Sequence, residues 1–567
     1  MRKKIARSVA MGLVGLLIQQ GSGAAFGPPP EGPPTATPIK HLVVIYPENI
    51  SFDHYFGTYP VAANPAGEPQ FHAQPWTPNV NGLSGALLTN NPNFLNTLNN
   101  STSNTGGGSG AAANPFRLDR SQAATADQNH DYGPEQAAAD SGLMDLFPFD
   151  VGNELSPPPL EASTVPNTDA QTMGYYDGNT VTALWNYAQY FAMNDNSFDT
   201  TFGPSTPGAI NLVSGQTNGA VAANYSNAVS FVPLVGPNTD GSYTIIGDTD
   251  PTGDVCSSTS ETSKGETVTM TGKNIGDLLN AAGISWGWFQ GGFNLTLTNN
   301  GPGGNGESGC NRKTTSAVTG VTKVDFIPHH AAFQYYASTA NPTHARPTVP
   351  PSQYGQYSAP ADAANHQYDT DDFFAALAAN NLPSVSFIKP PGFQQGHPEY
   401  SDPLDEQTFL VTVLNALQQS RFWSSTAVVI SWDDSDGWYD HVMSPILNQS
   451  ASSADALTGP GACGTGDAAL PGVNPALAHA QGRCGYGPRL PFLVISPFSR
   501  PNFVDHTLTA QVSAIRFVED NWLGGQRIQG SFDAITNSID SMLDFRRPQP
   551  NPPLLLDPST GEPLHFF

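Results

Sequence analysis

The chain has 567 residues, of which 38% are hydrophobic and 10% aromatic, and this composition excludes a protein that is disordered throughout. Only 12% of the residues are charged, and 48 acidic residues against 22 basic ones give a formal net charge of −26. Such a chain lacks the broad positive surface that binds nucleic acid, so an anionic substrate must be held locally, by a metal ion, by histidines or by backbone amides.

The first residues predict export. Four basic side chains precede an apolar stretch from Val9 to Ile18, and small residues follow up to Ala25, which is typical of a signal peptide over residues 1–25. No later stretch offers the roughly 18 uninterrupted apolar residues of a membrane-spanning helix. We therefore expect a periplasmic or extracellular protein without integral membrane association. The sequence leaves its oligomeric state open.

The cysteines are even in number, and none forms a C-x-x-C pair: Cys256, Cys310, Cys463 and Cys484. In an exported chain this favours structural disulfides over a cysteine-ligated metal, whose ligands are usually closely spaced. Three pairings are possible. We favour Cys256 with Cys310 and Cys463 with Cys484, because each bond would close a glycine-rich excursion.

The regular elements follow a Pro- and Gly-rich linker at residues 26–39. Short apolar runs predict buried strands at 41–46, 384–388, 426–431 and 490–496, and amphipathic patterns predict helices at 182–193, 276–282, 405–423 and 508–522. Strands that alternate with helices indicate an α/β fold with a mostly parallel sheet. The irregular stretches 61–129, 214–262, 296–322 and 450–487 are interpreted as insertions over the sheet. We expect one domain over residues 40–547 and a C-terminal tail at 548–567.

Carboxylates follow two of the predicted strands. Glu48 and Asn49 come just after the first strand, and Asp433 and Asp434 come just after the strand at 426–431. In open parallel sheets ligands bind outside the carboxyl ends of the strands, so we expect these groups to converge. Three carboxylates and an amide oxygen suit a divalent cation. The alternative is that the two aspartates cap a helix or begin a turn.

A nucleophile and general acids are also available. A loop framed by Gly and Pro at residues 202–208 would hold Ser205 rigidly, although the same string is ordinary turn chemistry, and serine needs a base or a metal to become a nucleophile. Six histidines lie in polar or turn-rich surroundings, where they could protonate a leaving group or bind phosphate oxygens: His130, His329, His330, His397, His441 and His506. For each of them an ordinary structural histidine is the alternative.

These residues carry a family resemblance. The string ENISFDHYFG at residues 48–57 closely resembles the ENxSFDHYFG signature of the bacterial phosphoesterase family that contains secreted acid phosphatases and phospholipases C. Similarity continues along nearly the whole mature chain, at residues 130, 142–145, 203–205, 286–292, 329–330, 396–398, 433–442, 487–489 and 505–506.

The resemblance implies an alkaline-phosphatase-like α/β fold and hydrolysis of phosphate esters. It implies one divalent metal ion, of unknown identity, held by Glu48, Asn49, Asp433 and Asp434, with Ser205 as a covalent nucleophile that also touches the metal. It further implies a phosphate pocket lined by His130, His330 and His397, with His329, His441 and His506 as further candidates. Phospholipase C members generally carry Thr at the nucleophile position followed by Pro-Asn-Arg, and Ser205 with Pro207-Gly208-Ala209 therefore favours the acid phosphatase branch.

The predicted function is that of a secreted, metal-dependent phosphomonoesterase that forms a phosphoserine, with an acidic optimum set by a protonated histidine. A phospholipase C or another phosphodiesterase is the nearer alternative. The distant alternative is a noncatalytic extracellular protein that binds calcium through its acidic groups and glycans through its loops.

Overall fold

The computed structural model describes residues 33–101, 111–152, 169–223, 233–238, 240–260, 262–351, 353, 357, 362–467, 482–547 and 551–564. The predicted signal peptide and residues 26–32 of the predicted linker lie outside this part of the chain. Among the described helices, none combines the length and the apolar character that crossing a bilayer requires.

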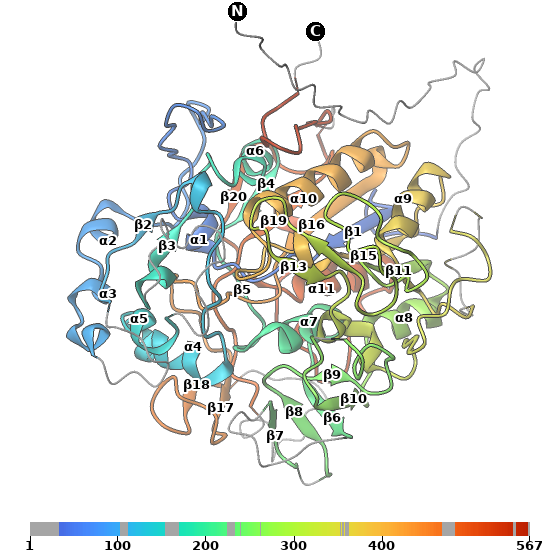
Figure 1. Cartoon of the computed structure of the whole chain (residues 1–567), viewed down its shortest axis with the longest axis horizontal. Coiled ribbons are helices and arrows are strands. Elements are labelled where there is room, and N and C mark those ends of the chain that lie inside the picture. The colour runs from blue at the N-terminus through green and yellow to red at the C-terminus, as the bar shows by residue number, and fades with distance from the viewer. Residues whose placement is uncertain are drawn as a thin grey trace, which may run out of the picture.

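A large central sheet organises the molecule (Figure 1). Within the described residues it has eight strands, in the order β14 (Gln367–Tyr368), β11 (Trp286–Gln290), β15 (Val385–Lys389), β1 (His41–Ile45), β16 (Thr426–Ser431), β19 (Phe492–Ile495), β4 (Ala192–Asn194) and β20 (Phe503–Asp505). Strands β14 to β16 are parallel to one another, whereas β19 is antiparallel to both of its neighbours. The predicted α/β class with a mostly parallel sheet is confirmed, and only the direction of β19 departs from it.

Helices cover both faces of this sheet, so its strands are buried on both sides. Leu42 and Val44 of β1 face one layer, and Val43 and Ile45 face the other. The first layer contains α7 (Ser205–Ser214), α8 (Ile275–Ala282) and α11 (Ser513–Trp522). The second contains α1 (Phe52–Phe56), α6 (Thr182–Tyr190), α9 (Thr370–Ala378) and α10 (Pro403–Gln418).

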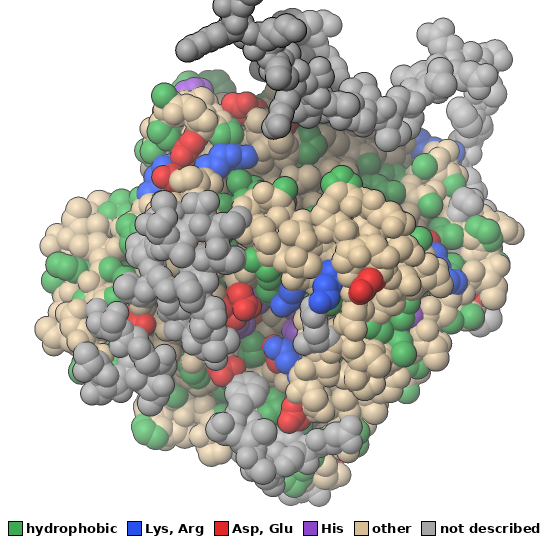
Figure 2. Space-filling view, in the orientation of Figure 1, with side chains coloured by type: hydrophobic (Ala, Val, Ile, Leu, Met, Phe, Trp, Pro, Cys, Tyr) green, Lys and Arg blue, Asp and Glu red, His purple; other side chains and the backbone are tan. Residues whose placement is uncertain are grey.

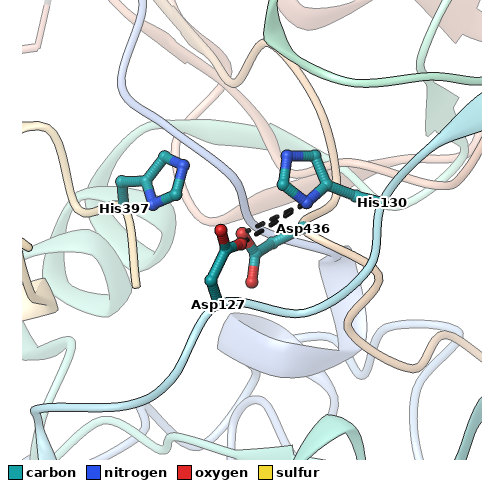
Figure 3. Close-up of side chains that lie close together, drawn as sticks. All are labelled: Asp127, His130, His397 and Asp436. Carbon is teal, nitrogen blue, oxygen red and sulfur yellow. Dashed lines mark ion pairs between the residues drawn. The ribbon is translucent and has the colours of Figure 1, made fainter. Parts of the chain in front are cut away.

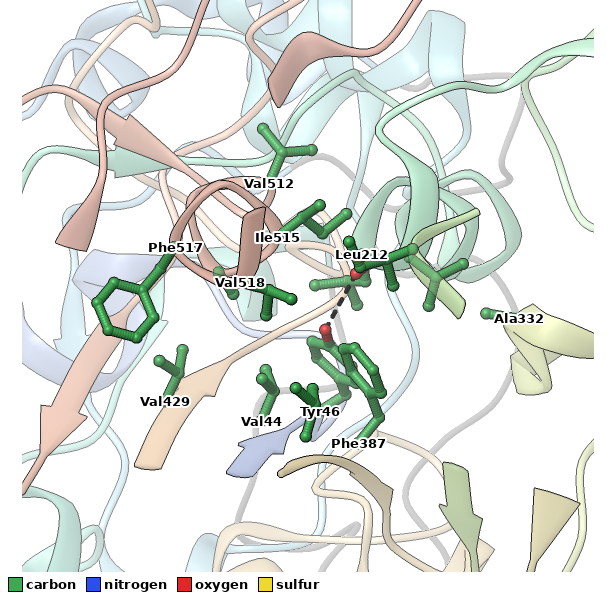
Figure 4. Packing of buried hydrophobic residues seen from close by; sticks show 14 of the residues in the cluster. Val44, Tyr46, Leu212, Ala332, Phe387, Val429, Val512, Ile515, Phe517 and Val518 are labelled. Atoms are coloured by element: carbon green, nitrogen blue, oxygen red, sulfur yellow. Dashed lines mark hydrogen bonds between the residues drawn. The ribbon is translucent and has the colours of Figure 1, made fainter. Parts of the chain in front are cut away.

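The first layer fixes helix α7 against the sheet (Figure 4). Apolar side chains of α11, such as Ile515 and Val518, pack over Val44 of β1. The hydroxyl of Tyr46, just past β1, donates a hydrogen bond to the carbonyl oxygen of Leu212 in α7 at 3.1 Å. This contact ties the end of the central strand to the helix that begins at Ser205.

The helix predicted at 405–423 spans Pro403–Gln418 as α10. Two more predicted helices also differ in their bounds. The helix predicted at 182–193 ends at Tyr190, because Ala192 to Asn194 pair with β19 and β20 as strand β4. The helix predicted from 508 begins at Ser513, because β21 (Thr509–Ala510) pairs with β5 (Ser197–Phe198). In both cases pairing with a distant segment overrides the local helical pattern.

The insertions build the surroundings of the sheet. A five-stranded sheet in the order β7 (Leu234–Val235), β8 (Tyr243–Ile245), β6 (Asn218–Ala222), β10 (Thr267–Met270) and β9 (Asp250–Pro251) lies beyond α7 in Figure 1. The other small elements are α2 (Gly85–Thr89), α3 (Pro92–Leu95), α4 (Tyr132–Ala139), α5 (Phe147–Asp150), β2 (Phe116–Arg117) with β3 (Gly174–Tyr175), β12 (Lys313–Thr315) with β13 (Thr322–Val324), and β17 (Asn448–Ser450) with β18 (Cys463–Asp467).

Two disulfides and the C-terminal segment complete the described fold. Cys256 bonds to Cys310 and Cys463 bonds to Cys484, so the favoured disulfide pairing is confirmed. The described part of the predicted C-terminal tail, residues 551–564, returns to α10, where Asn415 donates a hydrogen bond to the carbonyl oxygen of the buried Leu556 at 2.8 Å.

A buried carboxyl group makes the stability of this fold depend on pH. Glu406 of α10 accepts hydrogen bonds from the Trp432 indole at 2.9 Å and from the Tyr55 hydroxyl at 2.8 Å. Burial raises the pKa of Glu406 from 4.5 to about 8. The unfolded chain therefore ionises first as pH rises, so the stability contributed by this group is fully present below pH 4.5 and is lost as pH approaches 8.

We expect Glu406→Gln to flatten this dependence, because the amide does not titrate. Its Oε1 can accept the Trp432 indole N–H, and its Nε2 can donate to the Tyr55 hydroxyl, which reverses that hydrogen bond. Denaturant unfolding at pH 5 and pH 8 measures this effect. From pH 5 to pH 8, the free energy of unfolding of the variant relative to that of the wild type should rise by on the order of 1–3 kcal/mol. The exposed Glu307 offers a matched control, and Glu307→Gln should follow the wild type. Parallel curves for Glu406→Gln and the wild type would show that Glu406 is ionised in the folded protein.

Candidate active site

Three neighbouring strands deliver charged groups to the same edge of the sheet. Glu48 follows β1, Asp433 follows β16, and Lys389 is the last residue of β15. The Lys389 ammonium donates a hydrogen bond to Asp433 Oδ2 at 3.0 Å and contacts Glu48 Oε1. All three side chains are buried. The two carboxylates predicted to converge thus lie on either side of one ammonium group.

Ser205 is the first residue of α7, and its side chain points toward these carboxylates. Ser205 Oγ lies 3.3 Å from Glu48 Oε2 and 3.1 Å from Asp434 Oδ2. A Cβ atom at Gly208, one turn further along, would overlap with the Asp433 carbonyl oxygen, so the helix approaches the loop after β16 as closely as glycine allows. The positive end of the helix dipole therefore faces the carboxylate cluster.

Thr206 does not compete with Ser205 for this position. Its hydroxyl donates a hydrogen bond to the Thr249 carbonyl oxygen at 3.2 Å, and its backbone N–H donates to Asp248 Oδ1 at 3.0 Å. The Ser205 hydroxyl is thus the one of the two that faces Glu48 and Asp434.

Asn49 completes the group of predicted metal ligands. Its backbone has a left-handed φ of 56°, and its Nδ2 donates a hydrogen bond to Asp436 Oδ1 at 3.2 Å. Its Oδ1 is buried and has no hydrogen-bond partner among the described residues. Burial raises the pKa of the nearby Asp434 well above its usual range. A buried amide oxygen without a partner, next to Glu48 in the sequence, is a donor that a divalent cation would satisfy. Among the described residues, however, no group of three or more His, Cys, Asp or Glu side chains close enough together to hold an ion includes Glu48, Asp433 or Asp434.

The His329-His330 pair borders this group on the side of the small sheet. His330 Nδ1 lies 3.1 Å from Glu48 Oε1, and His329 Nε2 lies 3.6 Å from Asp248 Oδ2. Burial, the largest effect, lowers the pKa of His330 well below its usual range and that of His329 to about 3. Both shifts favour the neutral imidazole.

A second cluster lies on the other side of Asn49 (Figure 3). Its members are Asp127, His130, His397 and Asp436. His130 Nδ1 lies 3.5 Å from Asp127 Oδ1 and 3.8 Å from Asp436 Oδ1. Their ligand atoms lie close enough to one another to hold a metal ion.

The pKa values of the two histidines in this cluster are shifted in opposite directions. Burial works against charge on His130, but the carboxylates of Asp434, Asp127 and Asp436 outweigh it and raise its pKa well above the usual range. Burial and the neighbouring His130 lower the pKa of His397. Of the four histidines near Ser205, only His130 thus supports the protonated histidine that the expected acidic optimum requires.

The groups around Ser205 open onto a cavity of about 470 Å³. Ser205, His130, His329 and His397 line it, while His330 lies behind its wall. Figure 2 shows a hollow on this face of the molecule where basic and acidic side chains meet. Its other lining residues are mostly polar or charged: Asp127, Asp131, Pro204, Asp248, Thr262, Ser263, Lys264, Glu266, Lys323, Ile327, Glu399 and Tyr400.

Two predicted candidates lie elsewhere. The His441 ring bonds to Asp53 Oδ2 at 2.6 Å, in a network with the buried guanidinium of Arg489, which holds Asp53 Oδ1 at 3.0 Å. The His506 side chain is 68% exposed and bonds to Asp195 at 2.6 Å. Neither is among the described residues that line the cavity, so the structure places both apart from Ser205. Similarity to a motif marked them, but motif membership does not fix the direction of a side chain.

Sequence reasoning also missed residues of the site. Lys389 follows the predicted strand at 384–388, so the strand-end rule that selected Glu48 and Asp433 would have found it. Asp436 stands in the same loop as Asp434. Lys264 and Lys323 come from irregular insertions, where no periodic pattern signals them.

The sequence model of the Phosphoesterase family matches residues 39–523. This chain belongs to the Phosphoesterase family. The resemblance to this family is thereby confirmed, and the matched range includes every predicted site residue.

Several curated relatives are bacterial phospholipases C. The chain is 31% identical over 192 residues, 33% of its length, to the non-hemolytic phospholipase C of Pseudomonas aeruginosa, and the match covers 27% of that protein, so it spans about a quarter of this relative. It is 24% identical over 491 residues to phospholipase C A of Mycobacterium tuberculosis, which covers 85% of this chain and 72% of the relative. A solved protein in the alkaline phosphatase superfamily from Vibrio parahaemolyticus aligns over 81% of this chain and 82% of its own, with 10% identity and a TM-score of 0.28.

Proposed function

We propose that this protein is a metal-dependent phosphoric ester hydrolase that acts as a phosphomonoesterase through a phosphoserine at Ser205. The observation that carries the proposal is the position of the Ser205 hydroxyl. It lies at the N-terminus of α7, within 3.3 Å of Glu48 and 3.1 Å of Asp434, and on the wall of the cavity. Few structural roles would need a buried serine aimed at two buried carboxylates.

Glu48, Asn49, Asp433, Asp434 and Ser205 would hold one divalent cation, and its identity is open. When bound, the cation supplies positive charge that favours the ionised serine and offsets charge on the phosphate oxygens. The buried carboxylates and the unpartnered Asn49 Oδ1 support this ligand set.

The residues of the chain would divide the reaction as follows. Asp434 Oδ2 accepts the hydrogen bond of Ser205 and takes its proton as Oγ forms a bond to phosphorus. The bond from phosphorus to the ester oxygen breaks, and this oxygen receives a proton from His130, which lines the cavity. Water then attacks the phosphoserine and gives a proton to His130, the bond from phosphorus to Oγ breaks, and Asp434 returns its proton to the Ser205 oxygen as phosphate leaves.

The lining of the cavity favours a small polar leaving group. Its walls are largely charged or polar, and the apolar or aromatic contributions come from Pro204, Ile327 and Tyr400. A diacylglycerol leaving group would need a larger apolar surface. Phospholipase C remains a second candidate because several relatives carry that name.

Turnover of two chromogenic esters separates these candidates. We expect the metal-loaded protein to hydrolyse p-nitrophenyl phosphate with a higher kcat/KM than p-nitrophenyl phosphorylcholine, and a chelator to abolish both activities. The reverse preference would assign the protein to the phosphodiesterases. No turnover of either ester would favour the noncatalytic binding protein.

The protein is also proposed to act in the periplasm or outside the cell. The disulfides Cys256–Cys310 and Cys463–Cys484 support this location, because such bonds persist in oxidising compartments.

A further inference from the structure

Among the described residues that line the cavity there are two lysines, Lys264 and Lys323, and no arginine. The rest of the charged lining is acidic or histidine: five carboxylates share the walls with them, from Asp127, Asp131, Asp248, Glu266 and Glu399. An anionic group that enters this cavity therefore meets fixed positive charge at the two lysines.

Lys264 is held beside the nucleophile. Its ammonium lies 2.9 Å from Asp248 Oδ2, and Asp248 Oδ1 accepts the backbone N–H of Thr206, the residue after Ser205, at 3.0 Å. The Lys264 backbone N–H donates to Asp250 Oδ2 at 2.8 Å, which fixes the turn that carries it. One carboxylate thus links this lysine to the first turn of α7.

Lys323 is held on the opposite insertion, in the hairpin of β12 and β13. Its ammonium lies 3.8 Å from the ring centre of Tyr400, and the Tyr400 ring stacks on His397 at 4.3 Å. An ion pair closes the base of this hairpin: Arg312, just before β12, places its Nε 2.8 Å from Oδ2 of Asp325, just after β13. Lys323 therefore stands next to a histidine of the cavity wall.

The two lysine-bearing insertions are joined covalently. Cys256 precedes Lys264 in one, Cys310 precedes Lys323 in the other, and the two cysteines form a disulfide. Asn311 adds a hydrogen bond to the Thr259 carbonyl oxygen at 3.1 Å. Two cations placed by cross-linked loops are preorganised, so a bound anion does not have to order them.

We propose that Lys264 and Lys323 select phosphomonoesters over phosphodiesters by binding the second negative charge of the monoester. This inference rests on the proposed function and names the substrate class of the same site. A phosphomonoester is largely a dianion at pH 7, because its second pKa is about 6, whereas a diester carries one charge. Since the other charged side chains of the wall are mostly carboxylates, loss of the lysines exposes the dianion to repulsion that the diester feels less.

The test is the double variant Lys264→Met with Lys323→Met, which removes both charges and keeps most of the aliphatic stems. We expect the ratio of kcat/KM for p-nitrophenyl phosphate to that for bis(p-nitrophenyl) phosphate, a diester with one negative charge and no cationic group, to fall at least about tenfold at pH 7.5. Inorganic phosphate, as a competitive inhibitor, should bind correspondingly more weakly. Lys313→Met, on the partner strand of the same hairpin, is the matched control and should leave the ratio unchanged.

An unchanged ratio, or an equal fall for both esters, would overturn the inference while the proposed hydrolase stands. Absence of turnover in the wild type would instead refute the proposed function itself. If the double variant unfolds, as judged by its thermal transition, each single variant should still lower the ratio in the same direction. Single variants with a wild-type ratio would then overturn the inference.

Discussion

Replacement of Ser205 by alanine is expected to lower kcat on p-nitrophenyl phosphate at least about 10³-fold, as removal of a covalent nucleophile does in other hydrolases. The fold should survive, because Ser205 is the first residue of α7 and its hydroxyl contacts carboxylates, not the packed core. Stopped-assay kinetics with metal-loaded protein and an unfolding curve for the variant measure the two quantities separately.

The intermediate offers a direct check on this expectation. Acid-quenched wild-type enzyme should carry phosphate on the peptide that contains Ser205, as detected by mass spectrometry, and Ser205→Ala should not. Thr206→Val is the neighbouring control, because the Thr206 hydroxyl bonds to the Thr249 carbonyl oxygen and faces away from the carboxylates. A fully active Ser205→Ala variant would remove Ser205 from the mechanism.

Lys389→Met is expected to reduce the free energy of unfolding by about 3–5 kcal/mol in the presence of a chelator. Lys389 is 1% exposed, and its ammonium lies between Glu48 and Asp433, both fully buried. Removal of the cation leaves two buried carboxylates facing each other without compensation. Burial lowers the pKa of Lys389, and the carboxylates of Asp433 and Asp434 partly offset this effect.

A divalent cation should recover part of this loss, because it binds the folded state and neutralises the same carboxylates. Denaturant unfolding with and without metal should therefore show a larger metal-dependent gain for Lys389→Met than for the wild type. The exposed Lys273 provides the control, and Lys273→Met should change stability by less than about 0.5 kcal/mol. Wild-type stability of Lys389→Met in chelator would show that Lys389 is not the counterion of this cluster.

The regular core was accessible from local patterns. Strands β1, β15 and β16 are runs of apolar, often β-branched residues, and such runs signal a strand buried on both faces without knowledge of its partners. Strand β11 was not predicted, because its sequence, WGWFQ, combines glycine with aromatic residues and lacks the aliphatic run that indicated the other strands. The direction of β19 was equally hidden, since it depends on how a long connection returns to the sheet.

The sequence by itself determined the α/β class and the convergence of Glu48 with Asp433, because strand ends in a parallel sheet share one edge whatever the intervening loops do. For the disulfides it favoured one of three pairings, and the structure decided among them. Only the tertiary structure decided that Lys264 and Lys323 join Ser205 at one cavity, and that His441 and His506 do not. These placements arise from contacts between insertions far apart in the chain. Such contacts produce no periodic pattern in the amino-acid sequence.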